Sequence, residues 1–332
     1  MKTRKLGQNG PEIAAVGYGA MSFSDFYGPT TEENSHAILD AMRDWGVNHI
    51  DTSNIYGMGG SEDAIGSYLS KNPEAKTFFS IATKASITRD ADNNRIFRND
   101  RAHLEAELDI SLKRMGVDRV DLFYVHRRDP EMPIEEVVEG LVEIMGTGKI
   151  GSFGFSEIAP SNLRRAAAVH PVAAVQSEYS LQTRSPEMGL VQTCSELGTS
   201  LVAFSPVGRS LLTDHPLTVN ALDELPFLKD NPRFQQPNFD ANIAATDKLR
   251  ALAKEMGEPA AALANAWLLA QGDQVIPIPG TRSVEHFREC VRGAEIDLSA
   301  EDLARIEAIL PIGWAHGDRY SAGQWVGPER YC

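Results

Sequence analysis

The 332-residue sequence predicts an α/β fold of the TIM-barrel class, a (β/α)8 barrel of eight parallel strands. Short apolar runs alternate with amphipathic helical patterns over most of the chain, and this alternation indicates a parallel sheet. Eight such runs can be counted, nearly all followed by a helix, which suits closure into a barrel. No linker, internal repeat or shift in composition divides the sequence, so we expect residues 1–332 to form one domain.

The first residues are expected to form a β-hairpin that plugs the lower end of the barrel. Residues 3–13 surround the pair Asn9-Gly10, which is typical of a tight turn between antiparallel strands. The apolar residues 13–18 follow and are predicted to be the first barrel strand. Residues 17–22 begin like a dinucleotide-binding fingerprint but lack its third glycine and the helix after it. We therefore interpret these glycines as a tight turn at the barrel mouth.

Capping residues mark the ends of two predicted helices. Thr30 and Glu33 have capping-box spacing, and Gly46 would end the helix that they begin. Asp100 is expected to cap a long helix that Gly116 terminates. The other predicted strands are 49–51, 77–83, 120–125, 150–155, 173–177, 200–204 and 274–278, and the other predicted helices are 134–145, 162–169, 189–197, 244–256, 260–270, 283–293 and 300–310.

Two segments interrupt the alternation of strands and helices. Residues 213–243 contain four prolines and several large apolar side chains, and residues 311–332 carry aromatic side chains among glycines. Aromatic residues are depleted in disordered segments. We therefore expect both segments to be ordered, long loops over the C-terminal face of the barrel, where substrate contacts belong.

Composition and charge disfavour several classes of partner. A net charge of −14 would repel nucleic acid and anionic membranes. The N-terminus has no apolar run behind its basic residues, and the longest mostly apolar stretch, 260–270, is too short to cross a bilayer. Neither cysteines nor histidines show metal-ligand spacing, so we expect no metal site. The cysteines are odd in number and far apart, which suggests reduced thiols in a cytoplasmic protein; they are Cys194, Cys290 and Cys332.

Polar residues follow the predicted strands at the end where barrel active sites lie. Asp51, Lys84 and His126 come directly after three strands, and Tyr56 lies in the loop just past Asp51. Each of the four has an ordinary structural explanation when taken singly. Their convergence on one mouth favours a catalytic cluster. Further polar positions at strand ends are Ser156, Glu157, Gln176 and Ser205.

These residue types suit the reduction of a carbonyl group. Such a reaction needs a hydride donor and a proton for the developing alkoxide. A tyrosine has a pKa of about 10, too high for easy proton exchange at neutral pH. A neighbouring lysine ammonium stabilises the phenolate, a carboxylate keeps that lysine charged, and a histidine can orient the carbonyl oxygen.

The stretch from His49 to Gly57, HIDTSNIYG, resembles the D-T-A-x-x-Y-G signature of the aldo-keto reductases. Further blocks resemble the family in the family's order and span almost the whole chain. They are residues 82–84, 121–126, 148–157, 176–181, 203–206 and 278–282. Within this family, the sequence resembles the bacterial-type branch that is similar to the potassium channel β subunits.

The resemblance implies a catalytic tetrad of Asp51, Tyr56, Lys84 and His126, with NADPH as hydride donor to an aldehyde or ketone. It implies that Ser156, Glu157 and Gln176 lie at the nicotinamide carboxamide and that Phe204 stacks on the nicotinamide ring. Residues implied along the pyrophosphate are Ser205, Val207 and Arg209, and those implied at the adenosine end are Gly280, Thr281, Arg282, His286, Glu289 and Cys290.

Some positions depart from the family pattern. Glu157 stands where asparagine is commoner, His286 where arginine is frequent, and Cys290 where asparagine is frequent. Arginine at the position of His286 usually pairs with the 2′-phosphate of NADPH, and Arg282 could take over that bidentate role. We therefore expect NADPH and keep NADH as an alternative.

The substrate class stays open at the level of sequence. Phe23, Tyr27 and Tyr124 predict an aromatic-lined pocket for a small carbonyl compound. Two other functions remain: a Schiff-base barrel enzyme with Lys84 as nucleophile, and a cofactor-binding partner module of the channel β-subunit type. No heptad pattern or exposed apolar stripe indicates an oligomeric state.

Overall fold

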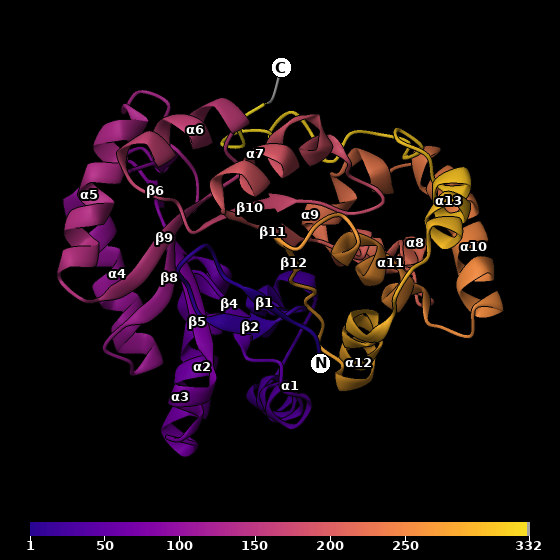
Figure 1. Cartoon of the computed structure of the whole chain (residues 1–332), viewed down its shortest axis with the longest axis horizontal. Coiled ribbons are helices and arrows are strands. Elements are labelled where there is room, and N and C mark those ends of the chain that lie inside the picture. The colour runs from indigo at the N-terminus through magenta and orange to yellow at the C-terminus, as the bar shows by residue number, and fades with distance from the viewer. Residues whose placement is uncertain (331–332) are drawn as a thin grey trace.

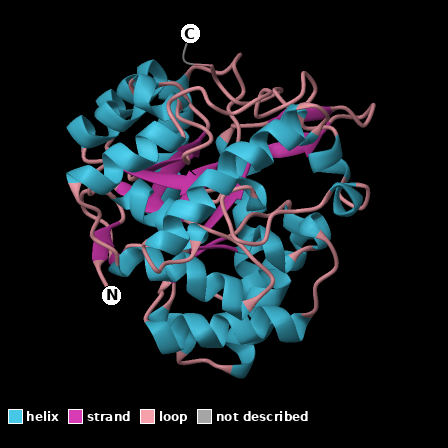
Figure 2. Cartoon of the chain, turned by 90° about the vertical axis from the view of Figure 1, so that its right-hand side faces the viewer, coloured by secondary structure: helices cyan, strands magenta, loops and turns pink. Residues whose placement is uncertain are grey.

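Eight parallel strands form the central sheet of the computed structural model, which describes residues 1–330. All neighbouring pairs in this sheet are parallel. Helices surround the strands (Figures 1 and 2). In sheet order the strands are β3 (Tyr18–Gly19), β4 (His49–Asp51), β5 (Ser80–Ala85), β8 (Val120–Val125), β9 (Ile150–Ser156), β10 (Ala174–Glu178), β11 (Ser200–Phe204) and β12 (Val275–Pro277).

The first and last strands meet, which closes the sheet into a barrel. The backbone N–H of Gly17 donates to the carbonyl of Pro277 at 2.9 Å, and that of Gly19 donates to Pro279 at 3.1 Å. A Cβ atom on Gly280 would lie 2.3 Å from the carbonyl oxygen of Gly19. Glycine at this position is therefore required by close backbone approach. The predicted fold class is confirmed, and the glycines that we interpreted as a tight turn also form the seam of the barrel.

The N-terminal hairpin forms as predicted and fills the bottom of the barrel. Strand β1 (Thr3–Lys5) pairs antiparallel with β2 (Glu12–Ala14). Leu6 and Ile13 are fully buried in one cluster with apolar side chains from the inside of the barrel. The predicted first strand over 13–18 was therefore wrong in part, because residues 13 and 14 belong to the hairpin and only Tyr18 enters the barrel sheet.

The helices lie outside the strands and bury their apolar faces against them in the main core. Figure 2 shows helices around the strands from the side. Their bounds are α1 (Glu32–Trp45), α2 (Gly60–Lys71), α3 (Ala75–Phe78), α4 (Arg101–Met115), α5 (Ile134–Gly146), α6 (Pro160–Val169), α7 (Leu190–Leu197), α8 (Val219–Leu222), α9 (Pro226–Lys229), α10 (Asn238–Glu255), α11 (Ala260–Leu269), α12 (Val284–Arg292) and α13 (Ala300–Ile309).

Most of the predicted caps are present. Asp100 accepts a hydrogen bond from the His103 backbone N–H, and Gly46 and Gly116 end their helices in the left-handed conformation. The cap of α1 lies one residue later than predicted, because the hydroxyl of Thr31, not Thr30, accepts from the backbone of the first turn.

Two further predicted elements begin three or more residues away from the predicted position. Residues 75–78 form the short helix α3, so the strand predicted over 77–83 begins at Ser80 and extends to Ala85. Lys84 therefore lies within β5 instead of after it. Helix α10 begins six positions before the predicted residue 244, at Asn238.

The two segments that interrupt the alternation lie over the mouth of the barrel. Residues 213–243 contain α8 and α9, whose leucines pack with Phe234 and Phe239 in a small apolar cluster. The C-terminal segment 311–330 contacts this region, since the side chain of Gln324 donates to the carbonyl of Phe227. Residues 331 and 332 of the predicted second loop, including Cys332, lie outside the described residues.

A second hairpin was not predicted. Strands β6 (Ile87–Arg89) and β7 (Arg95–Phe97) pair antiparallel between β5 and α4. Within residues 1–330, no helix has the length and apolar character needed to cross a membrane.

Candidate active site

Lys84, inside β5, is the centre of a buried polar cluster. Its side chain is fully buried, and its ammonium group donates to the carboxylate of Asp51, to the carbonyl of Thr52 at 2.7 Å and to the phenol oxygen of Tyr56 at 3.2 Å. Asp51 is the last residue of β4, the neighbouring strand. The three N–H groups of the lysine are thus all used.

The charge on Lys84 is stabilised by this arrangement. Burial alone would lower the pKa of Lys84, but the negative charge of Asp51 and the contact with Tyr56 outweigh burial and raise it. The second carboxylate oxygen of Asp51 accepts from the side-chain amide of Gln176 at 2.7 Å. Lys84 is therefore a charged, immobilised ammonium and not a free amine, which disfavours a Schiff-base role.

Tyr56 extends from the loop after β4 into the mouth of the barrel. Its phenol oxygen accepts from Lys84, and among the described residues no acceptor takes its own proton. The hydroxyl can therefore donate to a molecule in the cavity.

His126 comes directly after β8, and its ring lies beside the ring of Tyr56. The two rings are nearly perpendicular with centroids 5.9 Å apart. Burial and the positive charges of Arg127 and Lys84 hold the pKa of His126 well below its ordinary value, so the imidazole is neutral. Its Nδ1 lies 3.1 Å from the hydroxyl of Ser53. When Ser53 donates to Nδ1, Nε2 carries the proton and is a hydrogen-bond donor.

A cavity of about 1080 Å³ opens above this cluster. It is large enough for more than one small molecule, because ligand sites typically measure about 300–1,000 Å³. The predicted site residues that line it are Asp51, Tyr56, His126, Ser156, Gln176, Phe204, Ser205, Val207, Arg209, Gly280, Thr281, Arg282, His286 and Tyr27.

Six predicted site residues do not line this cavity: Lys84 is buried in the cluster described above, and the other five have different surroundings. Glu157 forms a bidentate ion pair with Arg319, and Glu289 faces His215 at 3.7 Å. Cys290 is buried, and burial raises the pKa of its thiol to about 12. Two aromatic residues expected at the substrate, Phe23 and Tyr124, are also buried away from the cavity.

Tyr124 instead supports the cluster from below. Its ring centroid lies 5.8 Å from the ammonium nitrogen of Lys84, and the residue is completely buried in the barrel core. Phe23 packs on the ring of Tyr18 with centroids 5.0 Å apart.

The sequence did not predict several residues that line the cavity. Arg89 and Arg95 come from the second hairpin, and Arg127 follows His126. The turn Asp-Asn-Asn at 92–94 between two short β-prone runs is the sequence signal that could have identified this hairpin. Phe227 and Tyr320 line the cavity from the two segments over the mouth.

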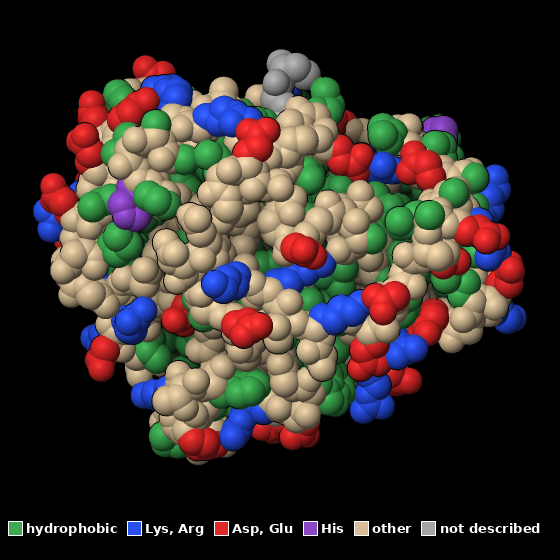
Figure 3. Space-filling model, viewed as in Figure 1, with side chains coloured by type: hydrophobic (Ala, Val, Ile, Leu, Met, Phe, Trp, Pro, Cys, Tyr) green, Lys and Arg blue, Asp and Glu red, His purple; other side chains and the backbone are tan. Residues whose placement is uncertain are grey.

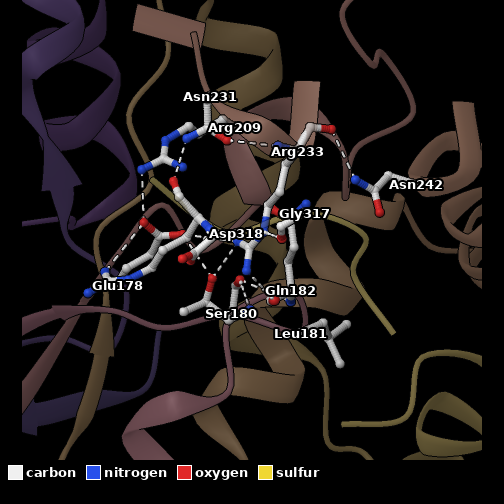
Figure 4. A network of polar contacts seen from close by, with 12 residues as sticks. Glu178, Ser180, Leu181, Gln182, Arg209, Asn231, Arg233, Asn242, Gly317 and Asp318 are labelled. Carbon is white, nitrogen blue, oxygen red and sulfur yellow. Dashed lines mark hydrogen bonds and ion pairs between the residues drawn. The ribbon is translucent and has the colours of Figure 1, made fainter. Parts of the chain in front are cut away.

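A buried ion network attaches these segments to the barrel (Figure 4). Glu178, at the end of β10, accepts from Arg209 at 2.8 Å and from Arg233 at 3.4 Å. Arg319 of the C-terminal segment binds Glu157 after β9 and lies 3.6 Å from Glu178. Burial raises the pKa of Glu178, but the charges of the three arginines outweigh burial and hold it below its ordinary value.

The last residues of the C-terminal segment lie along α6. Glu329 accepts from the backbone of Ala159 and the side chain of Asn162, and it pairs with Arg128 at 2.7 Å. Figure 1 shows this end of the chain beside α6. The ion pairs and these contacts together fix the C-terminal segment over the cavity.

Comparison with known proteins supports this description of the fold. The model of the aldo/keto reductase family matches residues 15–311. The chain belongs to the aldo/keto reductase family. An aldo-keto reductase from Schizosaccharomyces pombe, named yakc [NADP(+)], is 36% identical over 97% of this chain and 95% of its own length.

Further proteins are similar to this chain over most of its length. A probable aldo-keto reductase 1 from Glycine max is 35% identical over 96% of this chain and 92% of its own. Among solved structures, the glycerol dehydrogenase of Gluconobacter oxydans superposes with a TM-score of 0.80 at 26% identity, covering 93% of this chain and 94% of that one. A thermostable aldo-keto reductase in complex with the inhibitor epalrestat gives a TM-score of 0.72 at 28% identity, covering 93% and 100%.

No group of three or more histidine, cysteine or acidic side chains within residues 1–330 is placed to hold a metal ion.

Proposed function

We propose that this aldo-keto reductase is an NADPH-dependent enzyme that reduces the carbonyl group of an aldehyde or ketone, with Tyr56 as the proton donor. The observation that carries the proposal is the hydrogen-bond arrangement at Tyr56. Its oxygen accepts from the buried ammonium of Lys84, and its proton is left to donate into the cavity. One relative's name carries NADP(+), which supports the choice of cofactor.

The cavity suits an extended dinucleotide. Gln176, Ser156 and Phe204 lie at its inner end, where an amide and an aromatic ring would find hydrogen-bond partners and a stacking surface. Arg282 and His286 line the cavity from the loop after β12 and from α12, and they would hold the 2′-phosphate. Bound there, NADPH would supply a hydride to the carbonyl carbon of the substrate.

The protein's own groups then have separate tasks. Tyr56 donates its proton to the carbonyl oxygen as negative charge develops there, and Lys84 stabilises the charge left on the phenol oxygen. Neutral His126 donates a hydrogen bond from Nε2 to the same carbonyl oxygen and orients it. Asp51 keeps Lys84 charged and in place.

Absorbance of reduced nicotinamide, followed with NADPH and with NADH over a panel of aldehydes and ketones, tests the proposal. We expect oxidation of NADPH that depends on the carbonyl compound. Tight NADPH binding without turnover of any carbonyl would contradict it and would favour a partner-binding role like that of the channel β subunits. Borohydride trapping of a substrate on Lys84 would favour the Schiff-base alternative.

We further propose that residues 1–332 act as one catalytic unit. The C-terminal segment supports this view, since Arg319 and Glu329 bind residues that follow β9 of the barrel.

A further inference from the structure

Three arginines form one wall of the cavity next to His126. Arg89 and Arg95 are paired positions on the two strands of the β6–β7 hairpin, and Arg127 follows His126 at the end of β8. All three line the same cavity as Tyr56. We call these residues the arginine wall.

The arginine wall has no acidic partner. Within residues 1–330, none of its three guanidinium groups lies within 4.0 Å of a carboxylate, whereas many other arginines of the chain form ion pairs. Arg127 donates to its neighbour's carbonyl and to the hydroxyl of Ser156 at 2.9 Å, while its buried Nε has no partner. Arg89 reaches only the carbonyl of Asn93, and Arg95 lies over the ring of Phe97 at 5.5 Å.

Uncompensated positive charge at one place is unusual in a chain of net charge −14. On the face shown in Figure 3, acidic and basic side chains are interspersed. The two carboxylates that line the cavity are occupied elsewhere, Asp51 by Lys84 and Gln176, and Glu107 by the side chain of Asn54 at 2.7 Å.

The charges of the wall act on one another and on the site. Burial lowers the pKa of Arg95, and the charges of Arg127 and Arg89 lower it further. The charges of Arg127 and Arg95 also contribute to the low pKa of His126. An anion placed between these groups would relieve their repulsion, and planar guanidinium groups suit carboxylate and phosphate oxygens in bidentate geometry.

We propose that the substrate is an anionic carbonyl compound, whose carbonyl oxygen meets Tyr56 and His126 while its carboxylate or phosphate binds the arginine wall. This inference rests on the proposed reductase function. The anionic parts of NADPH are assigned to other residues, along Ser205 to Arg209 and Gly280 to His286, and the wall contacts an implied cofactor residue only where Arg127 donates to Ser156, so the wall is left for the anionic group of the substrate.

The test compares acids with their uncharged esters. ω-Oxo carboxylic acids of increasing length and their methyl esters are assayed with NADPH, beside glyceraldehyde 3-phosphate and glyceraldehyde. For the best length we expect kcat/KM at least tenfold higher for the acid than for the ester, with the ratio falling as salt is added. A preference confined to the phosphate pair would support the proposal with phosphate as the anion. Equal rates for every charged and uncharged pair would overturn it.

Variants of the hairpin then assign the preference. In Arg95→Gln the acid-to-ester ratio should fall about tenfold, through KM of the acid, while the dissociation constant of NADPH stays within about twofold. Arg95→Lys should restore part of the ratio. Arg98→Gln is the matched control, because Arg98 lies three residues further along, is half exposed, pairs with Asp100 and does not line the cavity. A ratio unchanged in Arg95→Gln would contradict the assignment.

A binding measurement separates this inference from the reductase function. Unreactive dicarboxylates and their dimethyl esters are titrated into the protein saturated with NADPH, with and without Arg95→Gln. Binding of the dicarboxylate that weakens about tenfold in the variant supports the anion site even if no carbonyl is turned over. Turnover of neutral carbonyls with no binding preference for the dicarboxylate refutes the anion site and leaves the reductase function intact.

Discussion

The ammonium nitrogen of Lys84 lies 3.2 Å from the phenol oxygen of Tyr56, and the same ammonium is bonded to Asp51. Lys84 therefore both balances the buried charge of Asp51 and contacts the proposed proton donor, Tyr56. Its removal leaves the carboxylate of Asp51 buried without a compensating charge.

Lys84→Met should therefore lower the free energy of unfolding by about 3–5 kcal/mol and abolish most carbonyl reduction. In the double variant Asp51→Asn/Lys84→Met, the buried charge is gone, so we expect most of the stability to return without the activity. Urea unfolding and NADPH oxidation measure the two effects. If the double variant recovers turnover, Lys84 has no direct part in the chemistry.

Replacing Glu178 should destabilise the protein in a pH-dependent way. The pKa of Glu178 is lowered in the folded state, so its contribution is present above the unfolded value of about 4.3 and is lost as the pH falls through the folded value. At neutral pH we expect Glu178→Gln to cost about 3–5 kcal/mol, because it leaves buried arginines without their shared carboxylate.

The cost should begin to shrink as the pH falls below about 4.3, because the unfolded wild-type chain then binds a proton that the folded carboxylate does not yet bind. Denaturant unfolding of both proteins from pH 3.5 to 7 measures it. The control is Glu255→Gln, which removes an exposed pair with Arg305 and should have an effect below about 1 kcal/mol at every pH. A constant difference between wild type and Glu178→Gln across this range would refute the electrostatic explanation.

Closure of the barrel should depend on Gly280. Its added Cβ would lie 2.3 Å from a backbone oxygen of the first strand, and backbone at a sheet seam cannot move freely. We expect Gly280→Ala to lower stability by about 1–3 kcal/mol. Gly146→Ala is the control, since nothing lies within 4 Å of its Cβ position and alanine favours the end of α5. Similar melting temperatures for the two variants would contradict a tight seam.

Cofactor choice should depend on Arg282 and His286. Both line the cavity; Arg282 donates to the carbonyl of Pro29, and the His286 ring stacks on His215 with centroids 4.8 Å apart. Loss of a charge-assisted contact costs about 1.5–3 kcal/mol, so the double variant Arg282→Gln/His286→Ala should weaken NADPH binding at least about tenfold.

NADH binding should change little in the same variant, because NADH lacks the 2′-phosphate. Titration of nicotinamide fluorescence measures both constants. Arg288→Gln serves as the control, since Arg288 lies on α12 like His286 but covers the ring of Trp45 and does not line the cavity. Equal weakening of both cofactors would assign Arg282 and His286 to general packing.

The sequence predicted those parts of the fold that depend on local patterns. Strands β8 and β11 have the predicted bounds, because each is a mostly apolar run flanked by polar residues. Strand β3 was placed wrongly because it consists of only two residues, paired with β4, and because the other backbone bonds of this segment go to Pro277 and Pro279 at the far end of the chain. Hydrophobic periodicity carries no information about such a contact.

In the site too, residues marked by local patterns could be predicted, and contacts between distant parts of the chain could not. Asp51, Tyr56, Lys84 and His126 could be grouped from the sequence because the ends of parallel strands meet at one mouth. The fate of Glu157 could not be predicted, since its partner Arg319 stands 162 positions further along the chain. The arginine wall was missed because the β6–β7 hairpin lies outside the regular alternation of strands and helices.

The most direct test of the central claim is the single-turnover rate of Tyr56→Phe with NADPH bound, compared with wild type on the same carbonyl compound. The substitution removes only the phenol oxygen that Lys84 contacts. We predict that hydride transfer slows by a factor on the order of 10²–10⁴ while the dissociation constant of NADPH stays within about twofold. A variant that transfers hydride at the wild-type rate would show that the proton comes from another group.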